Sequence, residues 1–333
     1  MTKQNICVLG GGGFVGSHLV SLLAARGHRV VVATQRRARI KHLLVLPGVE
    51  VVEADIHDPA ALQSLFTGMD AAINLVGILH ESRPDGFQHA HVELPRKVIA
   101  ACAASGVRRL LHMSALGAEA ASKSRYQQSK SAGEALVRGA PGLDTTVFRP
   151  SVIFGPGDSF LALFAGLLQL APVVPLAGAA ARFQPVFVGD VARAFANALE
   201  RPETFGQRYD LCGPTVYTLA ELVNLTANTL GLRRRILPLG ATASYWFARL
   251  MELKPGAKLM TRDNHYAMLT DNVCLGGQPG GQPGGQPGEQ PSEQPGGCAQ
   301  PFGPPTPLES VIGYLKEADA RRSYMGFRTH AGR

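Results

Sequence analysis

Cysteine is scarce in this sequence, and its few residues lack the spacing of a metal site. Five cysteines occur in 333 residues, and no two of them form a CxxC pair. We therefore expect no zinc site and no other metal site. Several of the cysteines lie in apolar stretches, which predicts buried, reduced thiols. The five are Cys7, Cys102, Cys212, Cys274 and Cys298.

The sequence also lacks segments typical of secretion or membrane insertion. No basic and then apolar leader precedes the first predicted strand, which predicts a cytoplasmic protein. The strongly apolar stretch from Phe160 to Pro175 contains Gln169 and Pro172, and it is shorter than the roughly 20 residues of a spanning helix. We expect it to form a core helix or the wall of a cleft.

Positive charge is in excess, but no nucleic-acid-binding motif accompanies it. The formal net charge is +8, and the basic residues fall into separate clusters at Arg36 to Lys41, Arg233 to Arg235 and Arg321 to Arg322. We therefore expect no nucleic-acid partner. The charge favours contact with nucleotide phosphate and with an anionic membrane surface.

A glycine-rich turn is the main feature of the N-terminal region. The apolar run from Ile6 to Leu9 predicts a strand buried on both faces, and the residues from Ser17 to Arg26 predict an amphipathic helix. The glycines between them fit both Gly11-x-Gly13-x-x-Gly16 and Gly10-x-x-Gly13-x-x-Gly16. Such a turn predicts a dinucleotide site, because the helix N-terminus offers N–H groups to a pyrophosphate. The expected cofactor contacts are Gly10, Gly13, Phe14, Val15 and Gly16.

Strands and helices alternate beyond this turn. The alternation predicts an α/β fold, a Rossmann-type doubly wound parallel sheet. The predicted strands span residues 29–33, 49–54, 71–77, 109–113 and 145–148, and the predicted helices span 58–66 and 94–105. The segment from Tyr209 to Leu239 predicts a strand, a helix capped by Thr218 and a basic strand, which we assign to a small C-terminal α/β domain on the substrate side.

Four regions are expected along the chain. Residues 1–150 form an NAD(P)-binding Rossmann domain, and residues 151–274 form a substrate-side region with returns of the chain to the Rossmann core. Residues 275–300 are a Gly/Gln/Pro low-complexity insertion, from which no core can be built. A tolerated expansion is favoured over a ligand for a proline-binding module. Residues 301–333 form a C-terminal tail.

The end of the second predicted strand lacks the acidic residue that would bind the 2′-hydroxyl of NAD. Arg36 and Arg37 occupy this region instead, and guanidinium groups suit a 2′-phosphate. This favours NADP(H) as the cofactor, with NAD(H) as the alternative. The competing interpretation is that the two arginines only solvate a loop.

Further candidate contacts follow the next strands. Asp55 and Ile56 come after the third predicted strand, where an aspartate can meet the adenine edge. Asn74 and Gly77 come at the end of the fourth strand, on the edge of the sheet where parallel strands line a cofactor crevice. A nicotinamide dinucleotide bound at this edge would contact all four residues.

Tyr126 is the tyrosine of this chain that has a lysine, Lys130, four residues later. At that spacing both side chains lie on one face of a helix. The ammonium can lower the pKa of the phenol and bind the nicotinamide ribose, which would make Tyr126 a proton donor to a carbonyl. A tyrosine and a lysine at this spacing often occur together by chance. The pair is informative here because it follows the fifth predicted strand of a nucleotide-binding fold.

Together these motifs resemble the extended short-chain dehydrogenase/reductase superfamily, through Gly10-x-x-Gly13-x-x-Gly16, Asp55-Ile56 and Tyr126-x-x-x-Lys130. More narrowly, the chain resembles the atypical branch that contains the nucleotide-binding accessory subunit of respiratory complex I and its bacterial relatives. Residues 13–19, 114–118, 124–134, 149–158, 183–192 and 305–309 carry this likeness. It implies bound NADP(H), a small domain that closes over the nicotinamide, and Pro150 in a loop against the nicotinamide.

Two departures from the family pattern bear on activity. Leu116 occupies the place of a Ser or Thr that hydrogen-bonds the substrate oxygen, and His91 replaces the Asn of the proton relay. Ser114 is the candidate substitute for the missing hydroxyl. The loss of one such donor typically costs two to three powers of ten in rate, roughly. The sequence therefore leaves open whether the protein is an enzyme with an incomplete catalytic set.

Our leading hypothesis is an NADP(H)-binding atypical dehydrogenase-like protein, linked to respiratory complex I or quinone-related metabolism, with weak or no classical activity. The alternative is an active reductase or a nucleotide-sugar epimerase or dehydratase that uses Tyr126 and Lys130. The stretch from Tyr245 to Lys254 has helical spacing of apolar and basic residues. It predicts either a cap on the substrate domain or a weak peripheral contact with the inner face of the cytoplasmic membrane or with a respiratory complex.

Overall fold

Seven parallel strands form the central sheet of the molecule. The computed structural model describes residues 2–81, 84–253, 261–274 and 302–317. The strands are β1 (Asn5–Leu9), β2 (Arg29–Thr34), β3 (Val49–Glu53), β4 (Ala71–Asn74), β5 (Arg109–Met113), β6 (Asp144–Pro150) and β11 (Gln207–Leu211). Their order is β11-β6-β5-β4-β1-β2-β3, and every neighbouring pair is parallel. The predicted doubly wound Rossmann-type sheet is confirmed, with its topological switch point between β1 and β4.

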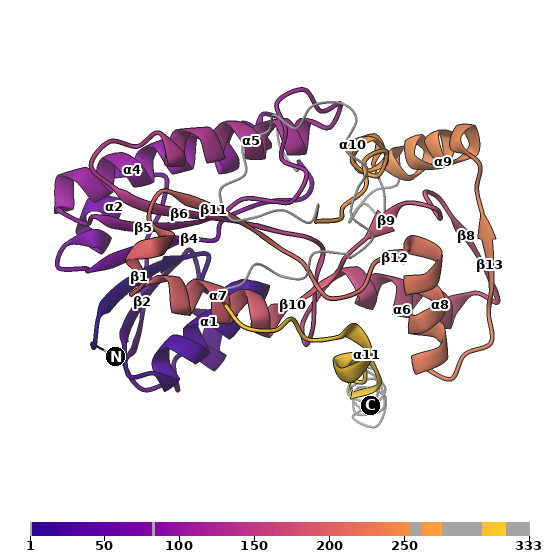
Figure 1. The fold of residues 1–333 in the computed structure, drawn as a ribbon, viewed down its shortest axis with the longest axis horizontal. Coiled ribbons are helices and arrows are strands. Elements are labelled where there is room, and N and C mark those ends of the chain that lie inside the picture. Colours follow the sequence, from indigo (N-terminus) through magenta and orange to yellow (C-terminus); the bar gives the residue numbers. More distant parts are fainter. Residues whose placement is uncertain (1, 82–83, 254–260, 275–301, 318–333) are drawn as a thin grey trace, which may run out of the picture.

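Helices cover both faces of this sheet (Figure 1). They are α1 (Phe14–Ala25), α2 (Pro59–Phe66), α4 (Leu94–Ser105), α5 (Arg125–Arg138) and α7 (Val188–Ala198). Helices α1 and α7 pack together on one face, and α2, α4 and α5 lie on the other. Successive side chains of a strand point to opposite faces of the sheet, and because the strands are mostly apolar, both faces are apolar. In β1, Ile6 and Val8 join the core under α1 and α7, whereas Cys7 and Leu9 join the opposite one.

Short helices complete the connections between the strands. They are the 3₁₀ helix η1 (Arg37–Leu43), the short helix α3 (Gly86–Gln88), the π turn η2 (His89–Glu93) and the 3₁₀ helix η3 (Pro202–Thr204). Asp58 caps α2 by accepting hydrogen bonds from Ala60 N and Ala61 N at 3.1 and 3.3 Å. This cap and Pro59 at the first helical position explain why α2 begins where the sequence predicts.

A smaller unit packs beside the carboxyl edge of the sheet (Figure 1). Its elements are β7 (Ile153–Phe154), α6 (Phe160–Leu170), β8 (Val173–Leu176), β9 (Arg182–Phe183), β10 (Val186–Phe187), β12 (Tyr217–Thr218), α8 (Leu219–Thr229), β13 (Arg235–Pro238), α9 (Ala241–Leu253) and α10 (Arg262–Ala267). Thr218 and Glu221 form the capping box of α8. The apolar stretch that begins at Phe160 forms a core helix followed by β8, as expected.

The described C-terminal residues, 302–317, pack against both units. Phe302 is buried among Phe148, Phe195 and Tyr209 on the Rossmann face that carries α7. The short helix α11 (Leu308–Val311) joins the core of the smaller unit. Asp190 of α7 holds this return by accepting hydrogen bonds from Thr306 N and Thr306 Oγ1 at 2.6 and 2.9 Å. The limits of the four predicted regions stay a prediction.

Two sequence expectations are wrong. The strand that begins near Tyr209 was expected in the small domain, but β11 pairs with β6 at the edge of the central sheet because its buried residues complete the Rossmann core. Several cysteines were expected as reduced thiols and no disulfide was foreseen, but Cys212 and Cys274 form one. Cys7 and Cys102 are free and buried, and burial raises the pKa of each to about 12. Cys298 lies outside the described residues.

None of the helices among the described residues is both long and apolar enough to cross a bilayer. In the same part of the chain, no three His, Cys, Asp or Glu side chains gather where a metal ion could bind.

Candidate active site

The glycine turn closes tightly between β1 and α1. Gly10 has a φ of +79°, and its carbonyl accepts a hydrogen bond from Gly13 N at 3.0 Å. A Cβ at Gly16 would lie 2.2 Å from Gly10 O, so the turn requires glycine there. The structure therefore favours the Gly10-x-x-Gly13-x-x-Gly16 spacing. A Cβ at Gly12 would lie 2.3 Å from Ile40 Cγ2, which assigns that glycine to packing.

The N-terminus of α1 is suited to an anion. Gly13 is the N-cap residue and no side chain of the described residues caps it, and the first turn carries no acidic residue. Phe14 and Val15 follow in that turn, so their backbone positions border the expected pyrophosphate site. The loop after β7 approaches the same turn, where Pro156 O lies 2.9 Å from His18 Nε2.

Arg36 and Arg37 lie at the exposed end of β2. Arg36 N donates to Thr34 Oγ1 at 3.2 Å, and Arg37 N donates to Glu53 Oε1 at 2.7 Å. Both side chains are exposed. Glu53, at the end of β3, brings a carboxylate to the same corner. This carboxylate was not anticipated from the sequence. Parallel pairing of Thr34 with Glu53 places it there.

The ends of β3 and β4 carry the other predicted contacts. Asp55 is exposed, and its carboxylate accepts from His57 N at 2.9 Å, with Ile56 half-buried between them. Asn74 is fully buried and shapes the turn after β4 by accepting from Val76 N at 3.1 Å. This turn lies against the glycine turn, because a Cβ at Gly10 would lie 3.2 Å from Val76 N.

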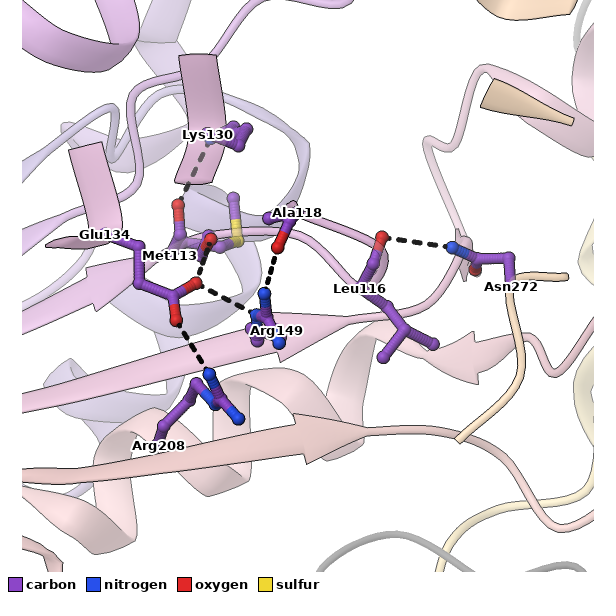
Figure 2. Close-up of polar contacts among 9 residues, drawn as sticks. Met113, Leu116, Ala118, Lys130, Glu134, Arg149, Arg208 and Asn272 are labelled. Atoms are coloured by element: carbon purple, nitrogen blue, oxygen red, sulfur yellow. Dashed lines mark hydrogen bonds and ion pairs between the residues drawn. The ribbon is translucent and has the colours of Figure 1, made fainter. Parts of the chain in front are cut away.

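Lys130 reaches the carboxyl edge from α5. Its ammonium donates to Met113 O at 3.2 Å (Figure 2). A Cβ at Gly77 would lie 2.9 Å from Nζ. Burial lowers the pKa of Lys130 to about 8. Lys130 and Gly77, predicted separately, thus form one part of the site.

Tyr126 lies one turn before Lys130, on the same helix. Its ring packs edge-on against Phe87 and His91, with centroid distances of 5.8 and 5.5 Å. Burial, and then the nearby Asp263 carboxylate, raise the pKa of Tyr126 to about 12. The lowered pKa that the sequence suggested is not found in this structure, because burial and the Asp263 carboxylate both raise it.

His91 occupies the place predicted for the relay group, on the π turn η2. Its Nε2 accepts from Ile78 N at 3.1 Å and its Nδ1 lies 2.8 Å from Ser129 Oγ. Because Ile78 N can only donate, the ring proton belongs on Nδ1. Burial, and then Lys130 and His112, lower the pKa of His91 to about 3, so the ring is neutral. Both ring nitrogens are engaged in holding the loop after β4 to α5.

Ser114 follows β5 and is directed toward α5. Its hydroxyl donates to Glu134 Oε2 at 2.7 Å, and both residues are buried. Glu134 also pairs with Arg149 at 2.9 Å and with Arg208 at 3.5 Å (Figure 2). The role of Ser114 as a substitute donor stays a prediction, and it would require the loss of this hydrogen bond. Sequence reasoning missed the Glu134 cluster, although Glu134 follows Lys130 at the same helical spacing.

Leu116 lies on the loop beyond Ser114. Its backbone N donates to Pro150 O at 2.9 Å, and its carbonyl accepts from Asn272 Nδ2 at 3.2 Å (Figure 2). The side chain is buried beside the disulfide of Cys212 and Cys274. This part of the site is therefore apolar where the family pattern has a hydroxyl.

A cavity of about 310 Å³ opens beside Tyr126. Phe87, which packs on the Tyr126 ring, forms part of its wall, together with Lys123 and Arg125 from the start of α5 and Asp263 and Tyr266 from α10. Apolar, cationic and anionic side chains therefore line this cavity, and it adjoins Tyr126 through Phe87.

Comparison with known proteins agrees with this geometry. Among curated proteins, subunit 9 of the NADH dehydrogenase [ubiquinone] 1 alpha subcomplex of Rattus norvegicus is 31% identical over 266 residues, which cover 77% of this chain and 69% of that protein. A ceramide reductase of Caulobacter vibrioides is 32% identical over 237 residues, which cover 70% of this chain and 73% of that protein.

Solved structures share the fold. A nucleoside-diphosphate-sugar epimerase of Staphylococcus aureus superposes with a TM-score of 0.64 at 18% identity, over 79% of this chain and 89% of that one. A dTDP-glucose 4,6-dehydratase of Streptomyces venezuelae, solved with NAD bound, gives 0.61 at 24% identity, over 70% and 84% of the two chains. The sequence profile of the NAD dependent epimerase/dehydratase family matches residues 6–212. The chain belongs to the NAD dependent epimerase/dehydratase family, within the extended short-chain dehydrogenases/reductases.

Proposed function

We propose that the protein binds NADP(H) at the carboxyl edge of its sheet and acts as an atypical dehydrogenase-like protein with weak or no classical turnover. The observation that carries this proposal is the combination, at one edge, of a closed glycine turn with an apolar residue, Leu116, at the donor position. The first feature retains the cofactor site and the second weakens the chemistry. In such a protein the cofactor is as much structural as reactive.

The residues present fit a nicotinamide dinucleotide. The turn has glycine at positions 10, 13 and 16, so no side chain at these positions keeps a pyrophosphate from its backbone. The N-terminus of α1 is also uncapped by side chains of the described residues. Asp55 follows β3 and Asn74 ends β4, both on the carboxyl edge of the sheet, with β1 and β2 between the two strands. When bound, a nicotinamide dinucleotide supplies or accepts a hydride. Tyr126 would donate a proton to a carbonyl oxygen, and Lys130 would bind the ribose.

Selection of the phosphorylated cofactor rests on Arg36 and Arg37, whose guanidinium groups are exposed beside the end of β2. They supply positive charge where a 2′-phosphate would lie. Glu53 opposes this, because its carboxylate lies at the same corner. With two arginines and one glutamate, the corner keeps a net positive charge, which supports NADP(H).

A link to respiratory complex I or to quinone metabolism is supported by the relative in Rattus norvegicus, whose name places it in NADH dehydrogenase. The second candidate function is an active carbonyl reductase. The intact Tyr126 and Lys130 pair favours it, as does the similarity to a protein named ceramide reductase.

Helix α9 supports a peripheral contact with an anionic membrane surface. Trp246 is 58% exposed and lies 5.5 Å from the Arg249 guanidinium, so an aromatic and a cation share an exposed site. Tyr245 instead contacts His265 of α10, with centroids 6.1 Å apart, which supports the competing role of α9 as a cap. Lys254 lies outside the described residues.

The deciding experiment identifies the nucleotide that co-purifies with the full chain. The protein is denatured, the released nucleotide is separated by chromatography, and its redox state is compared before and after addition of quinones, ketones and nucleotide sugars. NADP(H) whose redox state does not change supports the proposal. Rapid oxidation by one of these compounds supports the reductase instead, and the absence of any binding to added NADPH contradicts both.

A further inference from the structure

Asp263 joins two parts of the site that are far apart in sequence. It lies in the first turn of α10, and its carboxylate accepts hydrogen bonds from the start of α5, which is 14 residues long and carries Tyr126. Oδ1 accepts from Arg125 N at 2.6 Å. Oδ2 accepts from Ser124 Oγ at 2.8 Å and from Tyr126 N at 3.3 Å. A carboxylate is a favourable partner for these N-terminal N–H groups.

Ser124 already caps α5 locally, because its hydroxyl accepts from Gln127 N at 3.3 Å. The Asp263 carboxylate therefore adds a second cap, which reaches across more than 130 residues of sequence to the first turn of α5. Since Tyr126 N is one of its donors, the backbone that carries the phenol is held directly. Loss of α10 from this position would free the same three donors.

We propose that Asp263 is a positioning residue for Tyr126, which ties α10 to the first turn of α5 and so makes placement of the phenol depend on the docking of α10. The proposal rests on the assignment of Tyr126 as the proton donor. It also gives α10 a role beside the site, because Asp263 and Tyr266 line the same cavity as Phe87, and Phe87 packs on the Tyr126 ring.

The charge of Asp263 also has a chemical consequence. The titratable groups around the phenol and the adjoining cavity are Lys130, Arg125, Lys123, His91, His80, Glu81, Arg262, Tyr266 and Asp263. Glu81 is paired with Arg125 at 2.9 Å, and His91 is neutral. The Asp263 carboxylate disfavours the phenolate. A phenol with a raised pKa stays protonated at neutral pH, which is the state that carbonyl reduction needs, but it is a weaker acid, so its proton transfer to a carbonyl oxygen becomes less favourable.

The first test measures hydrogen exchange of the full chain by mass spectrometry. Asp263→Ala should raise exchange roughly five- to tenfold both in the first turn of α5 and in α10. Asp263→Asn, which keeps an oxygen acceptor, should restore most of the protection. Asp271→Asn is the matched control, because Asp271 lies in the same described segment as Asp263, residues 261–274, but is exposed and pairs with Arg182 instead of α5. Faster exchange in α10 alone, or in neither segment, would overturn the proposal.

The second test follows ionisation of Tyr126 by absorbance at about 295 nm within milliseconds of a jump to high pH, before unfolding. Subtraction of Tyr126→Phe isolates this side chain. Asp263→Asn should lower its apparent pKa, and the value should stay above that of a free tyrosine because burial remains. An unchanged pKa would overturn the proposal. NADPH titration of the wild-type protein separates the two ideas, since a protein that does not bind NADPH but shows both effects contradicts the proposed function alone.

Discussion

The Cβ position of Gly77 lies 2.9 Å from the ammonium nitrogen of Lys130. No side chain fits at position 77 unless Lys130 moves from its contact with Met113 O. A side chain at this position in the loop after β4 would therefore displace the lysine ammonium on α5, and the two residues define how closely that loop approaches the helix.

Gly77→Ala should displace Lys130 and weaken NADPH binding at least tenfold, with a loss of about 1–3 kcal/mol in the free energy of unfolding. Fluorescence titration and urea unfolding measure the two effects. Gly166→Ala is the control, because a Cβ there meets nothing within 4 Å and α6 gains helix propensity. Unchanged affinity in Gly77→Ala would show that Lys130 does not contact the cofactor.

Replacement of both Arg36 and Arg37 by Ala should weaken NADPH binding at least tenfold, roughly, and change NADH binding little, because only NADPH carries the 2′-phosphate. Isothermal titration of the wild-type and variant proteins with both reduced cofactors measures this. Arg29→Ala is the control, since Arg29 lies at the opposite end of β2 and pairs with Glu50 at 2.9 Å. Equal affinities of the wild type for both cofactors, or tighter binding of NADH, would sink the preference for NADP(H).

Carbonyl reduction by the wild-type protein should be slow, because Leu116 supplies no hydroxyl. Leu116→Ser should raise the rate by up to about a hundredfold, and Tyr126→Phe should abolish it. NADPH oxidation in the presence of quinones and ketones is the measurement. A wild-type turnover near about 10 per second would show that another residue supplies the donor.

His91 should make the fold sensitive to acid. Its pKa is about 3 in the folded protein and 6.5 for an ordinary histidine, so the unfolded chain binds the extra proton between these values. Stability is therefore lost as the pH falls below about 6.5, by up to about 1.4 kcal/mol per pH unit from this residue. Urea unfolding between pH 4.5 and 7.5 should show a weaker pH dependence for His91→Gln.

The matched control for this titration is His89→Gln, on the same π turn. His89 is exposed and pairs with Glu93 at 2.8 Å, so His89→Gln removes a surface histidine and leaves the buried imidazole of His91 in place. If His91→Gln and the wild type lose stability in parallel, the imidazole of His91 takes up its proton in the folded state.

The protein should bind anionic liposomes weakly at low salt and be released at high salt, because Trp246 and Arg249 offer an aromatic and a cation to the headgroup region. Flotation measures the bound fraction, and Trp246→Ser should reduce it. Val45→Ser is the control, since Val45 is 82% exposed on the Rossmann unit. No binding at low salt rejects the membrane contact, and binding that survives high salt and carbonate would implicate the apolar segment from Phe160 to Leu176.

Local pattern was sufficient for most of the Rossmann unit. The predicted ranges 94–105 and 109–113 coincide with α4 and β5, because apolar periodicity within each element matches the faces that the sheet buries. The helical spacing of Tyr126 and Lys130 placed both side chains at the edge where the glycine turn lies. These features depend on residues within a few positions of one another, which is why the sequence alone determined them.

Tertiary structure decided the contacts between distant segments. The disulfide joins cysteines 62 residues apart, and Asp263 reaches the start of α5 from far along the chain. No periodicity encodes such partners, because each depends on the path of the chain between them. The pKa values of Tyr126 and Lys130 could not be predicted from the sequence either, because burial is the main cause of both shifts. This burial exists only once the two units pack around α5.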